Sequence, residues 1–197
     1  SGKQGSGKSS LQKAIIEANK SPHTKIHMVN FADPLYQMHN YCLTVLEEHG
    51  IKRNIVKDGP LLQLLGTQWG RETIDPNIWV KMLKEKISHL WYTAKHHDDH
   101  LFLVGDCRFK NELLGLPEAL RVRLECSTEA RRARCSAWRE NDAHQSEIDL
   151  DDWTDKFDLI YSTEHQTPEF IAHSILWHLN DNQWINRRKK HEQEATT

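Results

Sequence analysis

The stretch that decides the fold is Gly2-Lys3-Gln4-Gly5-Ser6-Gly7-Lys8-Ser9, which satisfies the pattern GxxxxGK[ST]. Its glycines let successive backbone N–H groups turn inward around a polyphosphate. Lys8 then reaches the outer phosphate oxygens as a point charge, and the Ser9 hydroxyl is placed to ligate Mg²⁺. An amphipathic helix is predicted from residue 9 to 19, and its N-terminal dipole, with Ser10 in the first turn, favours the same anion. A glycine-rich surface loop that matches by chance is the alternative interpretation.

This motif requires a strand immediately before it, and only Ser1 precedes Gly2. That strand would be the central strand of the sheet, so we expect the first strand of the domain to be missing from the sequence. A central strand contributes a hydrogen-bond ladder and two apolar faces. We therefore expect lower stability than a domain with this strand has, and the activity of a chain without it is left open.

Apolar stretches of two kinds alternate along the rest of the chain. Strands are predicted at residues 25–31, 101–105, 119–126 and 157–162, and helices at 34–50, 60–66, 77–96 and 169–179. Thr167 and Pro168 form a good helix start, as N-cap and first-turn residue. The run 101–105 is the most continuous, as expected for a strand buried on both faces. This alternation predicts an α/β fold with a parallel sheet between two layers of helices.

Length and charge restrict the class of protein. The 197 residues fit one globular domain, predicted at 1–185, followed by a polar tail at 186–197. Lys and Arg total 26 against 28 Asp and Glu, a formal charge of −2, which argues against broad binding of nucleic acid or of an anionic membrane. No apolar run approaches the roughly 18 residues of a membrane span.

Cysteine usage indicates the compartment. The four cysteines, Cys42, Cys107, Cys126 and Cys135, show no CxxC spacing. They are typical of reduced thiols, so we expect a cytoplasmic protein, in the host cytoplasm if the protein is viral. The sequence leaves the oligomeric state open, a homodimer included.

Two residues after the apolar run at 101–105 are candidates for phosphate chemistry. Asp106 stands at the end of that strand, where a carboxylate holds Mg²⁺ directly or through a water. A solvated strand-end Asp is the alternative. Two residues later, Arg108 would face the same cleft, where a guanidinium grips a phosphate through two bonds. No [NT]KxD segment follows the glycine loop, which disfavours a GTPase.

Five segments together resemble the deoxynucleoside monophosphate kinases of bacteriophages, which are P-loop nucleotide kinases. They are residues 2–9, Phe31-Ala32-Asp33-Pro34-Leu35, Leu65-Gly66-Thr67-Gln68-Trp69-Gly70-Arg71, Asp106-Cys107-Arg108-Phe109-Lys110-Asn111-Glu112 and His144-Gln145-Ser146-Glu147. They come in the family order, and Phe157-Asp158-Leu159-Ile160 is similar to the family's last strand. Two departures are the missing first strand and Ser162, where the family often carries Asn. The resemblance implies a three-layer P-loop kinase fold with a small arginine-bearing lid.

The resemblance also implies residues that bind the acceptor nucleotide. Asp33 would face the acceptor or its phosphate-bound Mg²⁺, although an Asp before Pro is also a common turn or cap residue. Arg71, in a glycine-containing turn after a helical segment, would hold the acceptor 5′-phosphate; an exposed surface Arg is the alternative. Trp69 and Trp79 are candidates for stacking on the acceptor base, with core packing as the alternative for both. Glu112 and His144 would contact the base or the sugar, and a purely structural role stays open for both.

A predicted lid at about residues 127–147 carries a basic cluster. A helical composition is found from residue 129 to 140, and Arg131 and Arg134, three apart, share one face of such a helix. In nucleotide kinases, arginines of a lid cover the transferred phosphoryl group, neutralise its charge and exclude water. The resemblance implies this role for Arg131, Arg134 and Arg139. A solvated basic helix face is the alternative interpretation.

The resemblance implies transfer of the γ-phosphoryl group of ATP to a deoxynucleoside 5′-monophosphate. ATP and Mg²⁺ would be bound by residues 2–10, with Ser9 and Asp106 as metal ligands and Lys8, Arg108, Arg131 and Arg134 as the catalytic cations. Small nucleotides are then the expected ligands, and a homodimer stays open. Two alternatives stay open: a kinase of another phosphorylated metabolite, such as dephospho-coenzyme A, and a catalytically silent nucleotide-binding protein. The segment Thr67–Arg71 favours the nucleotide kinase.

Overall fold

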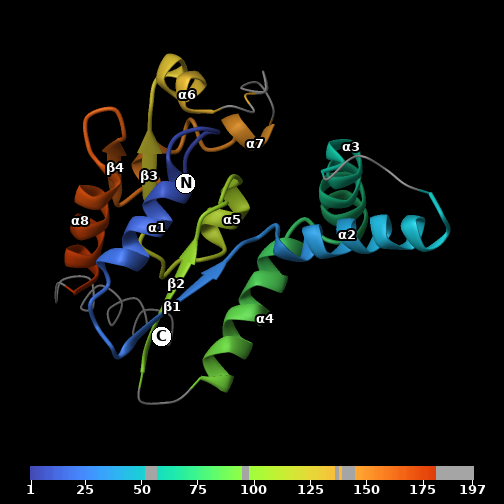
Figure 1. The fold of residues 1–197 in the computed structure, drawn as a ribbon, viewed down its shortest axis with the longest axis horizontal. Coiled ribbons are helices and arrows are strands. Elements are labelled where there is room, and N and C mark those ends of the chain that lie inside the picture. The colour runs from blue at the N-terminus through green and yellow to red at the C-terminus, as the bar shows by residue number, and fades with distance from the viewer. Residues whose placement is uncertain (52–56, 95–97, 136–137, 139–144, 181–197) are drawn as a thin grey trace, which may run out of the picture. The chain divides into compact units, whose positions relative to one another are not determined.

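The computed structural model describes residues 1–51, 57–94, 98–135, 138 and 145–180. These residues form a mixed α/β structure, as the sequence predicts (Figure 1). They fall into two compact units. Unit 1 combines Ser1–Ile26 with Arg108–Thr197, and unit 2 is His27–Cys107. The glycine loop and the described part of the predicted lid belong to unit 1. The predicted tail at 186–197 lies outside the described residues.

Unit 1 contains a parallel strand pair with helices around it. Its elements are α1 (Lys8–Ala18), α5 (Lys110–Leu114), β3 (Val122–Glu125), α6 (Thr128–Arg134), α7 (Gln145–Ile148), the 3₁₀ helix η2 (Thr154–Lys156), β4 (Leu159–Ser162) and α8 (Pro168–Asn180). Strands β3 and β4 are parallel, in a register that places Val122 opposite Leu159 and Glu125 opposite Ser162. The predicted parallel pairing is therefore confirmed for these two strands.

The opposite edge of β3 is occupied by the backbone of Ser1. The Ser1 amino group donates to the Val122 carbonyl at 2.7 Å, and the Leu124 N–H donates to the Ser1 carbonyl at 3.0 Å. Val122 and Leu124 of β3 thus bond to Ser1. On the other edge of β3, the Arg121 carbonyl accepts the N–H groups of Asp158 and Leu159, and the Glu125 carbonyl accepts the Thr163 N–H. Ser1 therefore lies where a strand neighbouring β3 would lie, directly before the glycine loop.

Helices α1 and α8 form the main helix pair of unit 1 (Figure 1). The buried residues of α1 are Leu11, Ala14 and Ile15, spaced three and four apart as the sequence predicts, and those of α8 are Ile171, Ala172 and Ile175. The N–H of Phe170 donates to the Thr167 hydroxyl at 3.2 Å, so the predicted N-cap of α8 is confirmed. This packing holds the start of α1, and with it the glycine loop.

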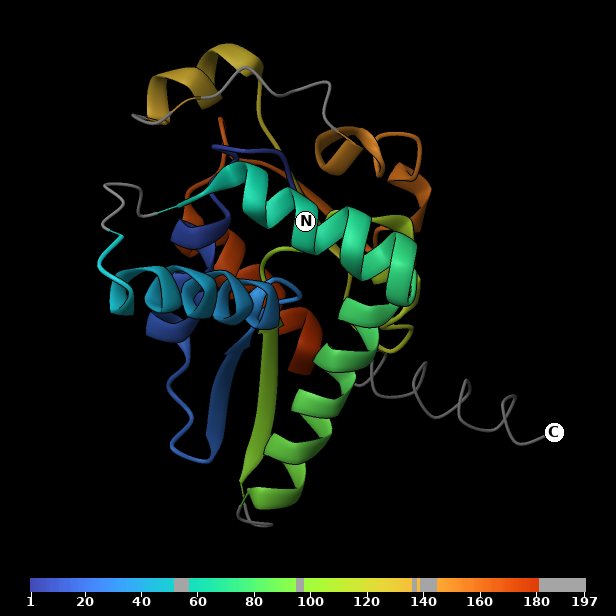
Figure 2. The same ribbon diagram turned by 90° about the vertical axis from the view of Figure 1, so that its right-hand side faces the viewer.

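Unit 2 is built around a strand pair and a helical cluster. Its elements are β1 (Thr24–Val29, whose first residues belong to unit 1), α2 (Asp33–Glu48), α3 (Gly59–Gln63), the π-helix η1 (Leu64–Ile74), α4 (Ile78–Thr93) and β2 (Asp99–Val104). Strands β1 and β2 are hydrogen-bonded neighbours, and α2 packs against α3 and η1 (Figure 2). Gly50, at a φ of +78°, follows α2, which confirms a glycine stop for this helix.

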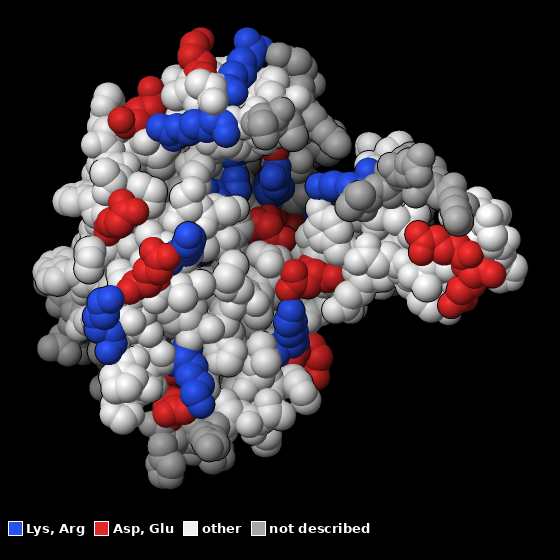
Figure 3. Space-filling view, viewed as in Figure 1, with Lys and Arg blue, Asp and Glu red and all other residues white. Residues whose placement is uncertain are grey.

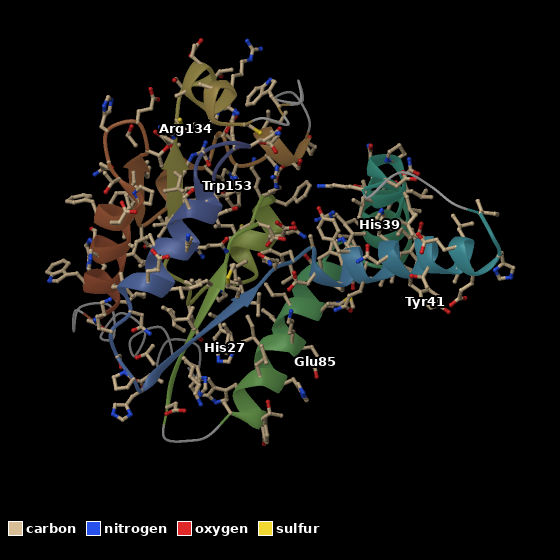
Figure 4. All side chains as sticks on the ribbon, in the orientation of Figure 1. His27, His39, Tyr41, Glu85, Arg134 and Trp153 are labelled. Carbon is tan, nitrogen blue, oxygen red and sulfur yellow. The ribbon has the colours of Figure 1, made fainter. Side chains whose placement is uncertain are left out.

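The start of α3 is fixed by a buried histidine. His39 of α2 is 1% exposed, and its Nε2 accepts a hydrogen bond from the Asp58 N–H at 3.0 Å (Figure 4). Asp58 in turn caps α3, because its Oδ1 accepts the Leu61 N–H at 3.0 Å. The two bonds tie the beginning of α3 to α2.

The predicted turn at Arg71 is wrong, because this residue lies in the π-helix η1, which continues α3. Both glycines of the segment face neighbouring helices. A Cβ atom on Gly70 would lie 2.5 Å from Cζ2 of Trp79, and one on Gly66 would lie 3.1 Å from Cδ2 of Leu35. The glycines thus allow close helix packing here and do not form a turn.

Two further predictions about elements need correction. The prediction that β2 is buried on both faces is wrong, because residues 100–104 are all partly exposed. The helix predicted over 129–140 ends at Arg134, since Cys135 is extended. The short helices α5 and α7 have no counterpart among the sequence-based expectations.

Surface charge agrees with the near-neutral composition. Acidic and basic side chains are interspersed over the face that Figure 3 shows. Among the described helices, none is long and apolar enough to cross a membrane.

Candidate phosphate-binding site

The glycine loop has a backbone conformation that glycine favours. Gly2, Gly5 and Gly7 have φ angles of +147°, +77° and +89°. Space is restricted as well, because a Cβ atom on Gly2 would lie 2.5 Å from the Ser6 hydroxyl oxygen, and one on Gly5 would lie 2.9 Å from the Arg131 carbonyl oxygen. Residues 2–7 therefore form a tight loop that ends at the first turn of α1.

Polar groups converge on this loop from inside it and from α1. The Ser6 side chain is 1% exposed, and its hydroxyl has no hydrogen-bond partner within the described part of the chain. The Lys8 Nζ donates to the carbonyls of Gly2 at 2.5 Å and Lys3 at 2.7 Å, so this cation lies across the loop. Ser9 and Ser10 are exposed on the first turn of α1. The Lys8 cation, the exposed residues Ser9 and Ser10 and the N-terminus of α1 thus lie together at the end of the loop, a combination that suits an oxyanion ligand.

A buried carboxylate lies at the rim of the loop. Glu147 of α7 is 5% exposed, and its Oε2 accepts the Gln4 N–H at 2.9 Å. Its Oε1 accepts a hydrogen bond from Nη1 of Arg108. The structure thus joins the glycine loop to Arg108, a predicted catalytic cation, through a residue to which the sequence interpretation gave no role.

The two lid arginines of α6 bond to the body of unit 1. Arg131 is 2% exposed, donates to the Gln4 carbonyl at 3.2 Å and to the Thr128 hydroxyl at 3.0 Å, and lies over the Trp138 ring. Arg134 donates to the hydroxyl and the carbonyl of Thr163, at 3.0 and 2.8 Å (Figure 4). These bonds give both side chains a structural task, and contact with a transferred phosphoryl group stays a prediction. Arg139 lies outside the described residues.

Glu112 has a structural task at the start of α5. It is 3% exposed, and its Oε2 accepts the N–H groups of Arg108 at 2.8 Å and Phe109 at 3.2 Å. These bonds fix the backbone that carries Arg108. The predicted contact of Glu112 with the acceptor is untested, and His144 lies outside the described residues.

In unit 2, Asp106 holds the backbone that precedes Asp33. Its two carboxylate oxygens accept the N–H groups of Phe31 at 3.0 Å and Ala32 at 2.9 Å. Burial raises the pKa of the Asp106 carboxyl above its ordinary value, and the nearby Asp33 charge adds to this effect, although the two amide bonds oppose it. The structure thus assigns Asp106 a positioning task, and the predicted contact with Mg²⁺ is untested.

Asp33 is held as a charged group. Its carboxylate accepts bonds from the Asn30 backbone and side chain, both at 3.1 Å, and from the Lys86 Nζ at 2.7 Å. Burial opposes the charge, but the bonds from Lys86 and Asn30 outweigh it and lower the pKa of Asp33 below its ordinary value.

Lys86→Met is therefore expected to raise the pKa of Asp33 relative to the native chain. Burial is then opposed by the Asn30 bonds alone. The stability that Asp33 contributes is present above its unfolded-state pKa and is lost as the pH falls through its folded-state pKa. In Lys86→Met these two pKa values lie closer together, so less of the free energy of unfolding should be lost on acidification. Carboxyl NMR titration measures the pKa, with Lys84→Met, an exposed change on the same helix, as the control. An unchanged pKa in Lys86→Met would contradict the assignment.

The three remaining candidates around η1 differ in accessibility. Trp69 is 39% exposed, which leaves its ring available for stacking. Trp79 is 3% exposed, and its Nε1 donates to the Gly66 carbonyl at 2.9 Å, so it belongs to the core. Nη1 of Arg71 donates to the same carbonyl at 3.0 Å. The predicted contacts of Trp69 and Arg71 with the acceptor stay predictions.

The donor set bears on the metal prediction. Within the described ranges, no group of three or more His, Cys, Asp or Glu side chains gathers to hold a metal ion. Mg²⁺ in nucleotide-dependent enzymes is commonly held by one or two protein oxygens together with substrate phosphates, so the exposed Ser9 hydroxyl fits such a site. Comparison with known proteins adds no relative: the chain matches no protein-family model and no curated protein.

Proposed function

We propose that this protein transfers the γ-phosphoryl group of ATP to the 5′-phosphate of a deoxynucleoside monophosphate, on a P-loop kinase fold. The observation that carries the proposal is the loop of residues 2–9. Three glycines with positive φ angles curl its backbone, Lys8 lies across it, and it leads into the N-terminus of α1.

The choice of acceptor rests on the sequence segments that resemble bacteriophage deoxynucleoside monophosphate kinases. The structure is compatible with it in one respect that can be followed residue by residue. Glu147 and Glu112 fix the position of Arg108, and 32% of its side chain stays exposed, so this cation is held close to the loop and is partly accessible.

The chemistry required of these residues is positioning and charge neutralisation. An oxygen of the acceptor phosphate attacks the γ-phosphorus, and the bond from this phosphorus to the β–γ bridging oxygen breaks, so ADP leaves with the electron pair. A phosphate acceptor with a pKa of about 6 is largely ionised at pH 7, and no strong general base is needed. Lys8 and Arg108 neutralise the charge that spreads over the transferred group. Bound Mg²⁺, with Ser9 as its candidate ligand in unit 1, would supply further charge neutralisation.

The test is an assay of ADP release coupled to a detectable reaction, with ATP, Mg²⁺ and a panel of deoxynucleoside monophosphates. Turnover with at least one panel member, and much less with ATP alone, is expected. Dephospho-coenzyme A belongs in the panel, because turnover with this compound alone would replace the proposal by the second kinase alternative. Binding of ATP without turnover of any acceptor would contradict a kinase and favour a nucleotide-binding protein.

A further inference from the structure

Glu147 places a buried carboxylate between the glycine loop and Arg108. One oxygen accepts the Gln4 backbone N–H at 2.9 Å, and the other accepts Nη1 of Arg108. The side chain of Glu147 is 1% exposed, whereas that of Arg108 is 32% exposed. Burying a carboxylate is costly unless its bonds are made, so Glu147 has a strong preference for this one arrangement.

The segment that follows Glu147 is anchored independently of it. The Lys110 N–H donates to Asp149 at 2.7 Å. Asp151 forms ion pairs with Lys3 at 2.7 Å and with Arg123 at 2.9 Å. These contacts hold residues 149–151 against the loop and against α5 whether or not Glu147 carries its charge. A substitution of Glu147 therefore changes its own two bonds while its neighbours stay in place.

We propose that Glu147 is a positioning residue that fixes the Arg108 guanidinium relative to the phosphate-binding loop. This inference rests on the proposed function, in which Arg108 contacts phosphate oxygens. Glu147 itself contacts the loop amide and Arg108, and acts through them. An arginine side chain has many rotamers, so a partner that selects one of them removes an entropic cost from each catalytic cycle.

Glu147→Gln tests this role with little change of shape. The amide retains one acceptor oxygen, but its NH₂ group cannot accept the second bond. We expect kcat/KM for the acceptor to fall by about 10- to 100-fold, the range of a small misplacement of a reacting group, and KM for ATP to change less. Asp152→Asn is the matched control: it removes a carboxylate of the same segment, paired with Lys110 and exposed, and should leave kcat/KM within about twofold.

A double-mutant cycle with Arg108→Lys then separates positioning from a general structural effect. If Glu147 acts through Arg108, the loss from Glu147→Gln should largely disappear in the Arg108→Lys background, because the planar fork that Glu147 holds is already absent. If the fall in kcat/KM in the double variant equals the product of the falls in the two single variants, the proposal is overturned. A Glu147→Gln variant with native kcat/KM overturns it as well.

A measurement on the native chain keeps the inference testable if Glu147→Gln fails to fold. Arginine side-chain NMR should show restricted rotation of the Arg108 guanidinium without any nucleotide, and freely averaged signals would overturn the proposal. This measurement also separates the two failures. A native chain that turns over no acceptor defeats the proposed function, whereas free rotation of Arg108 defeats the positioning role alone.

Discussion

Lys8→Ala is expected to lower the rate of phosphoryl transfer by roughly 10²- to 10³-fold, the effect of removing one charge aimed at a transferred group. The reason is local. Lys8 lies across the glycine loop, with its Nζ at 2.5 Å from the Gly2 carbonyl oxygen and 2.7 Å from the Lys3 carbonyl oxygen. A bound polyphosphate would draw this ammonium group from the two carbonyls to its own oxygens. Single-turnover measurements with saturating ATP report the step directly.

Lys13→Ala is the matched control for this prediction. Lys13 lies on the same helix and carries the same charge, but 78% of its side chain is exposed, and it pairs only loosely with Glu17 at 3.8 Å. Its removal should change the rate by less than about twofold. Native activity in Lys8→Ala would show that the loop does not bind the transferred phosphate. An equal loss of rate in both variants would mean that the net charge of the protein, and not the position of Lys8, determines the rate.

Trp79→Ala is expected to lower the free energy of unfolding of the chain by about 3–5 kcal/mol, the usual cost of truncating a buried aromatic residue. Trp79 is 3% exposed, its ring lies against Gly70, and its Nε1 donates to the Gly66 carbonyl. Truncation would leave a cavity between α4 and η1. Urea denaturation followed by far-ultraviolet circular dichroism measures the loss.

Trp79→Phe separates packing from hydrogen bonding. The Gly66 carbonyl keeps the bond from Arg71, so this variant should lose mainly apolar contact and cost clearly less than Trp79→Ala. Trp177→Ala, at a residue 63% exposed on α8, should stay within about 0.5 kcal/mol of the native chain. Equal losses in Trp79→Ala and Trp177→Ala would contradict a core position for Trp79.

The elements that the sequence predicted well are those with a clear period or a clear boundary. The helix after the glycine loop shows its apolar face at three- and four-residue spacing, and Thr167 and Pro168 mark the start of α8. The conformation of η1 could not be predicted in this way. It depends on Trp79 and Leu35, which pack against Gly70 and Gly66 from other helices, and glycine in a sequence indicates a turn at least as readily as a close approach.

The candidate site was predicted as a set of residue types and not as a set of contacts. The glycine spacing predicts a phosphate loop, and the structure shows positive φ angles at all three of its glycines. The sequence assigns no role to Glu147 beyond its place in a resembling segment, because the contact that accompanies its burial is made with Arg108, 39 positions away. Asp106 was interpreted as a metal ligand because a carboxylate at a strand end has that use. Its bonds to the amides of Phe31 and Ala32 arise from tertiary structure alone.

The packing of α1 on α8 has a consequence for the newly made chain. The apolar face of α1, formed by Leu11, Ala14 and Ile15, faces a helix that begins only at Pro168. At a synthesis rate of roughly 5–20 residues per second, α1 waits on the order of ten seconds for this partner. During that interval its apolar face is available to molecular chaperones, and the glycine loop gains its support only when nearly all of unit 1 has emerged from the ribosome.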